Sequence, residues 1–433
     1  MRPALALLLL AAPSWAGEHT APTPAAVPAL AKIIPVGPAQ QRRLSAGGDL
    51  QGTVDALPSG SHLVLAPGTH HGPVMLDRMI EVSGEPGAVI DGGGVGSVVV
   101  ITAPDVWLHD VRVTGGGFLS DRDDSGVVIG ADRFRVQRVV VDHAYLGVDV
   151  RRATGGAIED CTITGDATRA FGLRGDGIRL WEAEATVVTG NHLSHVRDLV
   201  VWYSDGNRIE DNEVRDSRYG THLMHSSDNV IRANTYLNDV VGVFVMYSGK
   251  VTIDGNQITG ARGEAGVGLG FKESDDVTVR NNQIVGDTTG LYLDTTPHRR
   301  GAVALFEHNL IAANQVGARF HGVSTGARFT GNDFTSNRLT ASVDGRVSTD
   351  AIAFEGNHWS EYAGYDLDGD GFGDLPYEAR EITGRLVERH PELAWFAGTP
   401  AEGLIEWLAA AFPMFAPEPI LVDQRPMMVA ERP

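Results

Sequence analysis

Short runs in which apolar and polar residues alternate fill most of the chain, and glycine, asparagine or aspartate separates one run from the next. Alternation with a period of two predicts β-strands, because successive side chains of a strand point to opposite faces. Glycine and asparagine between the runs accept the positive φ angles that tight corners require. The pattern therefore predicts an all-β protein built from many short strands.

One asparagine recurs in register along these runs, in motifs such as "TGNHL", "EDNEV", "RANTY" and "EGNHW". The steps between its copies are 21 to 27 residues, and the copies are Asn191, Asn212, Asn234, Asn256, Asn282, Asn309, Asn332 and Asn357. A polar residue kept at one place in every repeat suits coils stacked in parallel about 4.8 Å apart, in which the amides form a hydrogen-bonded ladder. We therefore expect a parallel β-helix over residues 49–360, right-handed by the general rule for crossover connections.

Cys161, in "EDCTI", falls in the slot of the repeating asparagine one longer step earlier. It is either a reactive thiol or a small buried member of the ladder. Because it is the only cysteine of the chain, an internal disulfide is excluded, and stability must come from packing.

The two ends of the chain differ from the coils. Residues 1–16 are predicted to be a signal peptide, because Arg2 is the only charge before an apolar run too short to span a bilayer. Residues 17–48 form an Ala/Pro-rich leader, and residues 361–390 an Asp/Gly-rich closing segment. The net charge of −20 argues against binding to nucleic acid or to an anionic lipid surface.

Residues 391–433 are predicted to form a C-terminal helix followed by an extended arm. The segment "PAEGLIEWLAAAFP" places Trp407 and Phe412 on one apolar stripe at helical spacing, and "MFAPEPILVDQRPMM" follows it. Packing on the end of the β-helix and insertion into a partner protein both fit this segment. Trp407 and Phe412 are therefore candidate partner-binding residues.

A column of outward residues follows from counting back ten positions from successive asparagines. The steadily aliphatic residues beside the column must fill the interior, so strict alternation points the column outward. An outward apolar column on an acidic protein indicates a binding surface. The column consists of Trp181, Trp202, Met224 and Met246, flanked two residues earlier by Val200, His222 and Phe244.

This column carries ligands for a soft metal ion. Met224 and Met246 lie on adjacent coils with Cβ atoms about 5 Å apart, and His222 is on the same face. Thioether and imidazole favour Cu(I) over Mg²⁺ or Ca²⁺. The alternative is a pliable docking surface for a protein, and the two interpretations are compatible. The direction of His225, directly after Met224, stays open.

The segment "YDLDGDGFGD" fits the first half of a calcium loop through Asp366, Asp368, Asp370 and Asp374. The twelfth position holds Tyr377 and not the bidentate glutamate, so the match is partial. A polar turn that closes the end of the β-helix is the alternative.

Parallel β-helices also carry polysaccharide lyases, hydrolases and epimerases. Such enzymes need outward carboxylates for acid and base catalysis, together with a basic residue. Further along the outward column stand Lys272, Asp294 and His321, with no second carboxylate beside them. A β-helix enzyme acting on polysaccharide, or a carbohydrate binder that stacks sugar on its tryptophans, is therefore the alternative function.

The chain resembles the NosD family, the periplasmic maturation proteins of nitrous oxide reductase. The resemblance is carried by "LAPGTHHGPVMLD", "GDGIRLW", "RYGTHLMHSSDN", "GVFVMYS", "WSEYAGYDLDGDGFGDLPY" and "AAFPMFAP". The aromatic, histidine and methionine positions of the family correspond to Tyr219, His222, Met224 and Met246. His225 departs from the family pattern, in which an aromatic residue is expected; it adds either a ligand or a local variation.

The resemblance implies a non-enzymatic accessory protein in the periplasm. It implies three partners: a membrane ABC transporter, a lipoprotein copper chaperone that hands over copper, and the nitrous oxide reductase apoenzyme. The function that it implies is support of the assembly of the copper–sulfur centre in that enzyme.

Overall fold

The computed structural model describes residues 39–322, 325–344, 349, 351–380, 399, 404 and 419–430. The predicted signal peptide and residues 17–38 of the leader lie outside the described residues. Trp407, Phe412 and nearly all of the predicted C-terminal helix lie outside them as well.

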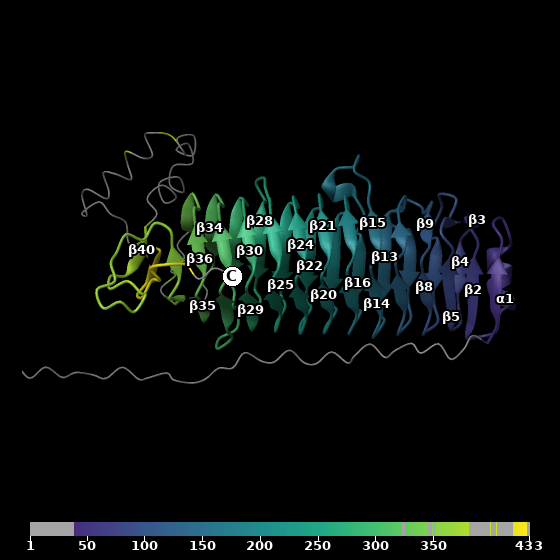
Figure 1. The fold of residues 1–433 in the computed structure, drawn as a ribbon, viewed down its shortest axis with the longest axis horizontal. Coiled ribbons are helices and arrows are strands. Elements are labelled where there is room, and N and C mark those ends of the chain that lie inside the picture. The colour runs from purple at the N-terminus through teal and green to yellow at the C-terminus, as the bar shows by residue number, and fades with distance from the viewer. Residues whose placement is uncertain are drawn as a thin grey trace, which may run out of the picture.

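The described chain winds into a parallel β-solenoid, an elongated stack of coils (Figure 1). Each full coil contributes one strand to each of three sheets, which we call A, B and C in chain order. Strands that neighbour one another within a sheet belong to successive coils and pair in parallel, except for the pair β40 and β41. The all-β prediction and the stacked parallel coils are confirmed.

Sheet A comprises, in order of pairing, β1 (Gln41–Leu44), β2 (Ser61–Leu65), β5 (Ile80–Gly84), β8 (Trp107–His109), β11 (Arg135–Gln137), β14 (Ala157–Glu159), β17 (Val187–Thr189), β20 (Arg208–Glu210), β23 (Val230–Arg232), β26 (Thr252–Asp254), β29 (Val277–Arg280), β32 (Ala304–Glu307), β35 (Ala327–Thr330), β38 (Ala353–Glu355), β41 (Leu421–Asp423) and β40 (Tyr377–Ala379).

Sheet B comprises β3 (Gly68–His71), β6 (Ala88–Asp91), β9 (Arg112–Thr114), β12 (Val140–Val141), β15 (Thr162–Thr164), β18 (His192–Ser194), β21 (Glu213–Arg215), β24 (Thr235–Leu237), β27 (Gln257–Thr259), β30 (Gln283–Val285), β33 (Leu310–Ala312), β36 (Asp333–Thr335) and β39 (His358–Trp359).

Sheet C comprises β4 (Val74–Leu76), β7 (Val99–Ile101), β10 (Ser125–Ile129), β13 (Leu146–Arg151), β16 (Ile178–Trp181), β19 (Asp198–Trp202), β22 (Tyr219–Met224), β25 (Val241–Met246), β28 (Val267–Lys272), β31 (Thr289–Asp294), β34 (Val316–His321) and β37 (Leu339–Asp344).

Two short helices interrupt this pattern. Helix α1 (Leu50–Ala56) lies at the N-terminal end of the stack (Figure 1) and buries Leu50 and Val54. The carboxylate of Asp49 caps it by accepting a hydrogen bond from the backbone N–H of Gly52 at 2.9 Å. The 3₁₀ helix η1 (Phe171–Leu173) lies in the loop between β15 and β16. The sheet stack begins at β1, within the stretch that the sequence assigned to the leader.

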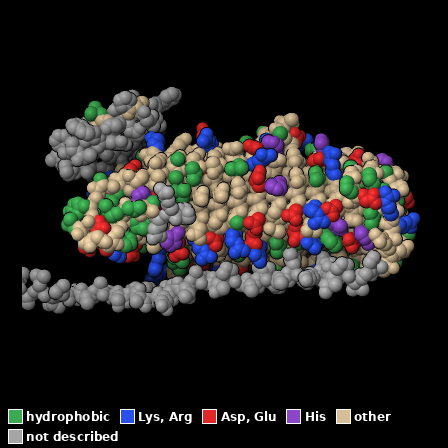
Figure 2. Space-filling model, in the orientation of Figure 1, with side chains coloured by type: hydrophobic (Ala, Val, Ile, Leu, Met, Phe, Trp, Pro, Cys, Tyr) green, Lys and Arg blue, Asp and Glu red, His purple; other side chains and the backbone are tan. Residues whose placement is uncertain are grey.

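The interior of the coils holds the aliphatic set that the sequence predicted. These side chains have no exposed surface, which agrees with strict alternation along each strand. They are Ile178, Leu180, Leu199, Val201, Leu223, Val243, Val245, Leu269 and Phe271, accompanied by the buried Thr221. On the outside, acidic and basic side chains are interspersed (Figure 2), and many of them pair between neighbouring coils.

The asparagine ladder is present over its whole predicted length. The side-chain oxygen of each asparagine accepts hydrogen bonds from the backbone N–H and the side-chain amide of the asparagine one coil earlier, at 2.8 to 3.1 Å. The backbone N–H of Cys161 donates to the first ladder asparagine, Asn191, at 2.9 Å. Burial raises the pKa of the Cys161 thiol to about 12. Cys161 is therefore a buried member of the ladder, and the reactive-thiol interpretation is wrong.

The ladder ends on a residue of the C-terminal arm, which the sequence analysis did not anticipate. Strand β41 joins sheet A beside β38, and Asp423 of β41 is fully buried. Its Oδ2 accepts hydrogen bonds from the backbone N–H of Asn357 at 2.9 Å and from the Asn357 side-chain amide at 3.0 Å. The same oxygen accepts from Nε1 of Trp359 at 3.1 Å. For residues 419–430, packing on the end of the solenoid is the observed arrangement.

Replacing Asp423 is expected to open the end of the stack. Asp423→Ala leaves the Asn357 donors and Trp359 Nε1 without an acceptor, which lowers the free energy of local opening by on the order of 2 kcal/mol. Hydrogen exchange measured by mass spectrometry should show faster exchange in β38, β39 and β41. Asp423→Asn, which keeps an acceptor oxygen, and the exposed Gln424→Ala are the controls. Equal protection in Asp423→Ala and the parent protein would contradict this role.

A second, shorter ladder contains a buried acid. Oδ1 of Asp287 accepts from the backbone N–H of Ala261 at 2.6 Å, and the Asp287 N–H donates to Oδ1 of Asn314 at 2.8 Å. Oδ2 of Asp287 has no hydrogen-bond partner among the described residues. Burial raises the pKa of the Asp287 carboxyl to about 7. The Asp287 carboxyl therefore stays protonated in the folded protein up to about pH 7, whereas in the unfolded chain it loses its proton above about pH 4.

This difference gives a pH dependence with a defined sign. Because the folded pKa lies above the unfolded one, the stability contribution of Asp287 is greatest below about pH 4 and is lost as the pH rises through about 7. Asp287→Asn should therefore raise the free energy of unfolding at pH 8, by up to about 4 kcal/mol for a shift of this size. Denaturant unfolding at pH 5 and pH 8 measures the effect, with the exposed Asp211→Asn as the charge-matched control. A variant no more stable than the parent at pH 8 would contradict it.

Candidate functional site

The predicted outward column lies on sheet C in the predicted register. Trp181 pairs with Trp202, Trp202 with Met224, and Met224 with Met246 across β16, β19, β22 and β25. These four side chains are partly exposed, as is Phe244. Val200, which the sequence analysis also placed on this outward face, is fully buried and offers no contact surface. We call Trp181, Trp202, His222, Met224, Phe244 and Met246 the tryptophan–methionine face.

His222 is the most enclosed member of this face, with 7% of its surface exposed. Its Nε2 lies 3.4 Å from the thioether sulfur of Met246. The ring stacks on Tyr219 with centroids 4.6 Å apart, and the ring of Trp202 meets it edge-on at 5.4 Å. The structure therefore brings together two of the three predicted copper ligands, and Met224 stands beside Met246 in register.

A buried carboxylate lies behind the imidazole. Nδ1 of His222 is 3.6 Å from Oδ2 of Asp198, which is longer than a hydrogen bond but within range of an ion pair. Asp198 is fully buried and also accepts a hydrogen bond from Nε of Arg218 at 2.9 Å. Burial opposes ionisation of Asp198, but the contacts with His222 and Arg218 outweigh it and lower the pKa of its carboxyl. An ionised carboxylate here favours a proton on Nδ1, which leaves the Nε2 lone pair facing Met246.

Asp198 lies two residues before Val200 on β19, one step beyond the positions that the sequence analysis counted. Between β19 and β22 the pairing shifts, so that Asp198 pairs with Tyr219 while Val200 pairs with His222. The extra residue in β22 places Tyr219, in place of Gly220, opposite Asp198. It also brings the ring of Tyr219 alongside His222.

His225 belongs to an aromatic stack at the end of these strands. Its ring lies between Tyr203 and Tyr247, with centroid distances of 5.2 and 5.0 Å. All three residues have positive φ, near 51°, which turns the chain at the corner of each coil. His225 therefore takes the place of an aromatic ring in this stack, and its direction, left open by the sequence, is settled.

A buried network of charges borders the face on its N-terminal side. Arg179 pairs with Asp149 at 2.8 Å, and Arg197 pairs with Asp176 in the next coil. Burial raises the pKa of Asp176 to about 6, although Arg197 opposes the shift. Breaking such pairs leaves a buried charge uncompensated, so they hold the neighbouring strands in a single arrangement.

Charged residues continue the column on its C-terminal side. Lys272 pairs with Asp294 at 3.4 Å, and His321 lies 3.4 Å from a carboxylate oxygen of Asp344. Lys272, Asp294 and His321 therefore follow one another along the column, as predicted. The expectation that no second carboxylate stands beside them is wrong, because Asp344 pairs with His321 on the next coil.

The predicted calcium loop is partly assembled. Oxygen atoms of Asp366, Asp368 and Asp370 lie within 4.8 Å of one another. Asp366 accepts the backbone N–H groups of residues 369 and 371, and Asp370 pairs with Arg425 at 2.5 Å. The fourth predicted ligand, Asp374, accepts a hydrogen bond from the N–H of Leu367 at 2.6 Å. Calcium binding stays a prediction, and the loop's own N–H groups and an arginine already satisfy these carboxylates.

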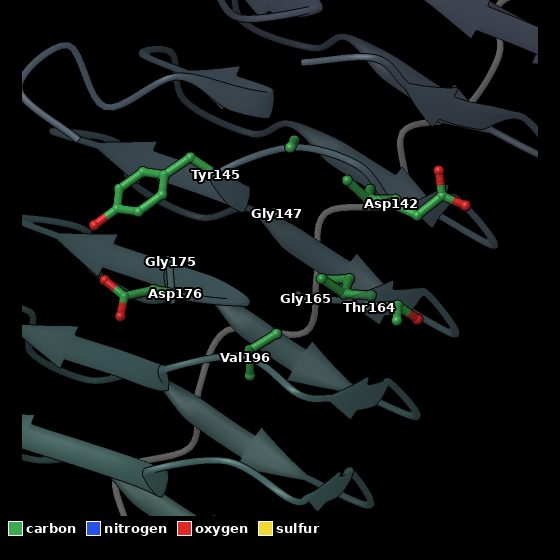
Figure 3. A pocket seen from close by; sticks show the side chains of 11 residues that line it. Asp142, Tyr145, Gly147, Thr164, Gly165, Gly175, Asp176 and Val196 are labelled. Carbon is green, nitrogen blue, oxygen red and sulfur yellow. The ribbon is translucent and has the colours of Figure 1, made fainter. Parts of the chain in front are cut away.

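A small hollow lies between the corners of neighbouring coils, next to Asp176 of the buried charge network. Tyr145 and Asp176 line it on one side (Figure 3). Glycines line much of the rest, and a Cβ at Gly175 would stand 1.6 Å from the carbonyl oxygen of Tyr145. The hollow is therefore a consequence of tight corner packing.

No helix among the described residues is long and apolar enough to cross a membrane.

Comparison with known proteins identifies relatives over most of the chain. The family model described as "Periplasmic copper-binding protein (NosD)" matches residues 154–364. The "Probable ABC transporter binding protein NosD" of Pseudomonas aeruginosa is 28% identical over 84% of this chain and 87% of its own length. The protein of the same name from Stutzerimonas stutzeri is 28% identical over 87% of this chain and 89% of its own length.

Solved structures share the fold at much lower identity. The catalytic domain of an α-1,3-glucanase in complex with nigerose has a TM-score of 0.55 at 13% identity, covering 73% of this chain and 67% of its own. The A-module of a mannuronan C-5 epimerase from Azotobacter vinelandii has a TM-score of 0.50 at 15% identity, covering 73% of this chain and all of its own. At these identities the likeness concerns the solenoid alone.

The family match spans the coils that carry the tryptophan–methionine face, and both relatives align over more than four fifths of the chain. The chain is therefore similar to the NosD family, which its family model describes as periplasmic and copper-binding.

Proposed function

We propose that this protein is a non-enzymatic accessory factor for assembly of the copper–sulfur centre of nitrous oxide reductase. In this role it works with a membrane ABC transporter, receives Cu(I) from a lipoprotein chaperone and presents it to the apoenzyme. The copper-binding description of the family and the names of the relatives support the proposal. The observation that carries it is the 3.4 Å contact between His222 Nε2 and the Met246 sulfur on an outward face.

This contact has the geometry of two ligands that share one ion. With bonds near 2.0 Å to nitrogen and 2.3 Å to sulfur, atoms 3.4 Å apart subtend an angle of about 100° at the metal. Met224, in register with Met246 on the adjacent coil, supplies a third donor. Thioether and imidazole are neutral and soft, so they select Cu(I) over harder cations. Neither thioether must lose a proton to bind, and neither adds charge, which favours weak and reversible binding.

The surroundings of His222 suit transient transfer. Asp198 orients the imidazole from behind, and the rings of Trp202 and Tyr219 prevent it from turning away. Trp181, Trp202 and Phe244 offer partly exposed apolar surface next to the ligands. A donor or client that docks on this surface would cover the ion and exclude water during handover. Trp407 and Phe412 remain proposed contacts to a partner, and they lie outside the described residues.

A carbohydrate-directed function has weaker support. Trp181 and Trp202 pack edge-to-face with centroids 5.7 Å apart, a cluster on which a sugar ring could stack. The outward acid that follows them, Asp294, is paired with Lys272. Turnover or binding of an acidic polysaccharide by the purified protein would support this alternative.

Cu(I) affinity tests the relay site directly. The mature protein is titrated anaerobically against a colorimetric Cu(I) chelator, beside His222→Ala and the double variant Met224→Leu/Met246→Leu. We expect one Cu(I) per chain, and at least a tenfold loss of affinity in each variant, because each removes a donor from a shared ion. The exposed methionines Met75 and Met79 provide the matched control, Met75→Leu/Met79→Leu.

Two results would contradict the relay site. One is the absence of Cu(I) binding by the folded parent protein, and the other is equal affinity in the parent protein and the His222→Ala variant. In either case the methionines would serve as docking surface only. Folding is verified by thermal unfolding monitored by circular dichroism.

Docking is tested separately with Trp202→Glu. The substitution places a charge in the middle of the apolar surface, and it should reduce capture of the apoenzyme or the copper chaperone at least tenfold in pull-down or surface-binding assays. Because Trp202 also packs on Trp181 and His222, thermal unfolding verifies that the variant is folded before capture is compared. Unchanged capture of both partners would exclude this surface.

A further inference from the structure

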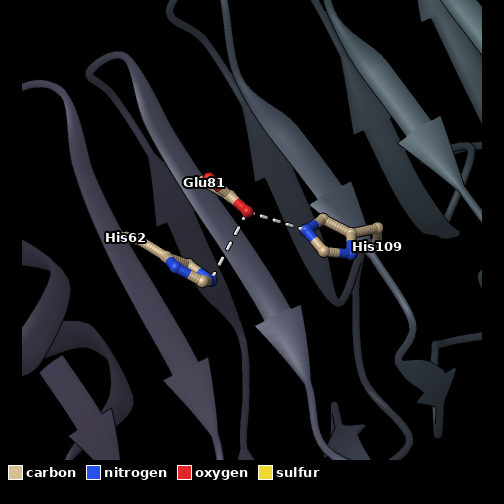
Figure 4. Close-up of side chains that lie close together, drawn as sticks. All are labelled: His62, Glu81 and His109. Atoms are coloured by element: carbon tan, nitrogen blue, oxygen red, sulfur yellow. Dashed lines mark hydrogen bonds and ion pairs between the residues drawn. The ribbon is translucent and has the colours of Figure 1, made fainter. Parts of the chain in front are cut away.

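A second cluster of metal-ligating side chains lies on sheet A, in the first coils of the solenoid and on a different sheet from the tryptophan–methionine face. His62 of β2, Glu81 of β5 and His109 of β8 come from three successive coils. Each offers one ligand atom, and the three atoms lie within 4.8 Å of one another. Figure 4 shows the two imidazoles pointing from either side toward the carboxylate.

The strand register brings these residues together. His62 pairs with Glu81, and Glu81 pairs with Trp107, which is two residues before His109 on β8. Glu81 therefore reaches His62 directly across one strand pair and His109 diagonally across the next. Oε1 of Glu81 lies 3.5 Å from Nε2 of His62 and 3.1 Å from Nε2 of His109. Ligands of a tetrahedral ion with bonds of 2.0 to 2.1 Å stand about 3.3 Å apart, close to both distances.

The second nitrogen of His109 is already held by a carboxylate. Nδ1 of His109 lies 2.6 Å from Oδ2 of Asp110, so a proton on Nδ1 is stabilised and Nε2 is directed at the cluster. The ring also stacks on Trp107 with centroids 4.2 Å apart. A carboxylate behind the imidazole and a fixed ring plane are the usual support of a histidine that binds metal.

The cluster is partly buried but keeps an opening. The exposed fractions of the three side chains are 19% for His62, 24% for Glu81 and 11% for His109. The hydroxyl of Ser83 is 2.7 Å from Nε2 of His62, at the edge of the same space. Three protein ligands with one accessible side match a site that completes its coordination with water.

We propose that His62, Glu81 and His109 bind one divalent transition-metal ion, Zn²⁺ or Cu²⁺. Imidazole and carboxylate are harder donors than thioether, so this site selects the divalent ions and leaves Cu(I) to the tryptophan–methionine face. The ion links β2, β5 and β8, and it thereby ties the first three coils together. This site is independent of the proposed copper relay.

The experiment uses tag-free mature protein carrying His222→Ala/Met246→Leu, which removes the relay ligands from the measurement. Zn²⁺ affinity is measured by competition with a chromophoric chelator, and Co²⁺ is added in parallel as a spectroscopic substitute for Zn²⁺. We expect one Zn²⁺ per chain and the visible absorption bands of four- or five-coordinate Co²⁺. Cu²⁺, titrated in the same way, should bind more tightly than Zn²⁺.

Glu81→Gln keeps the shape of the side chain and removes its charge, and His62→Ala removes one imidazole. Each should lower Zn²⁺ affinity at least tenfold, and the double variant should lose the Co²⁺ bands. His143→Ala is the matched control, because His143 lies 3.0 Å from Asp142 but is exposed and belongs to no group of three metal-ligating side chains among the described residues. Absence of stoichiometric Zn²⁺ binding in the parent background, or Co²⁺ bands that persist in the double variant, would overturn the proposal.

Discussion

The stacking of successive coils in strict register is the constraint on which the other features depend. In a parallel strand pair each residue lies opposite its counterpart one coil away. A side-chain type repeated at one position of every coil therefore forms a column, with successive members about 4.8 Å apart. Inside the corner, this rule makes a ladder of asparagines, each of which satisfies the backbone and side chain of the one before. On the outer surface, the same register aligns tryptophan, methionine and tyrosine side chains of successive coils in rows.

The same rule explains how a weak metal ligand set arises on a rigid surface. A thioether is a poor ligand when it must be ordered for the purpose, because the flexible side chain loses conformational freedom. On the solenoid, His222 is held by stacked rings and a buried carboxylate, and Met246 meets it from the adjacent strand. The solenoid fixes the positions of these side chains, so neutral ligands that bind metal weakly are sufficient.

The sequence predicted the solenoid and the outward column well, because the distance from each strand to its asparagine is constant in the middle coils. Features outside this constant spacing were not predicted. The bulge in β22 places Tyr219 opposite Asp198, which a constant spacing does not predict, and the arm that supplies Asp423 returns from far along the chain. The cluster around His109 lies before Cys161, where no ladder residue gives the register. The place of His225 in a ring stack depends on positive φ at the corner, which a pattern of alternation does not report.

The ladder's last acceptor has a consequence for the order in which the molecule can be completed. During synthesis from the N-terminus, each new coil can stack on the coil before it without waiting for later segments, because a coil contacts only its neighbours. Strand β38 pairs with β35 on one side, but its partner on the other side is β41. Residues 421–423 of β41 follow β38 by more than 60 positions in the chain. Until they are synthesised, the growing stack presents an unpaired strand edge, the kind of surface on which chains aggregate or exchange segments. Strand β41 covers the edge of β38, and the antiparallel strand β40 in turn covers β41, so the chain's own C-terminal segments extend sheet A beyond its last coil.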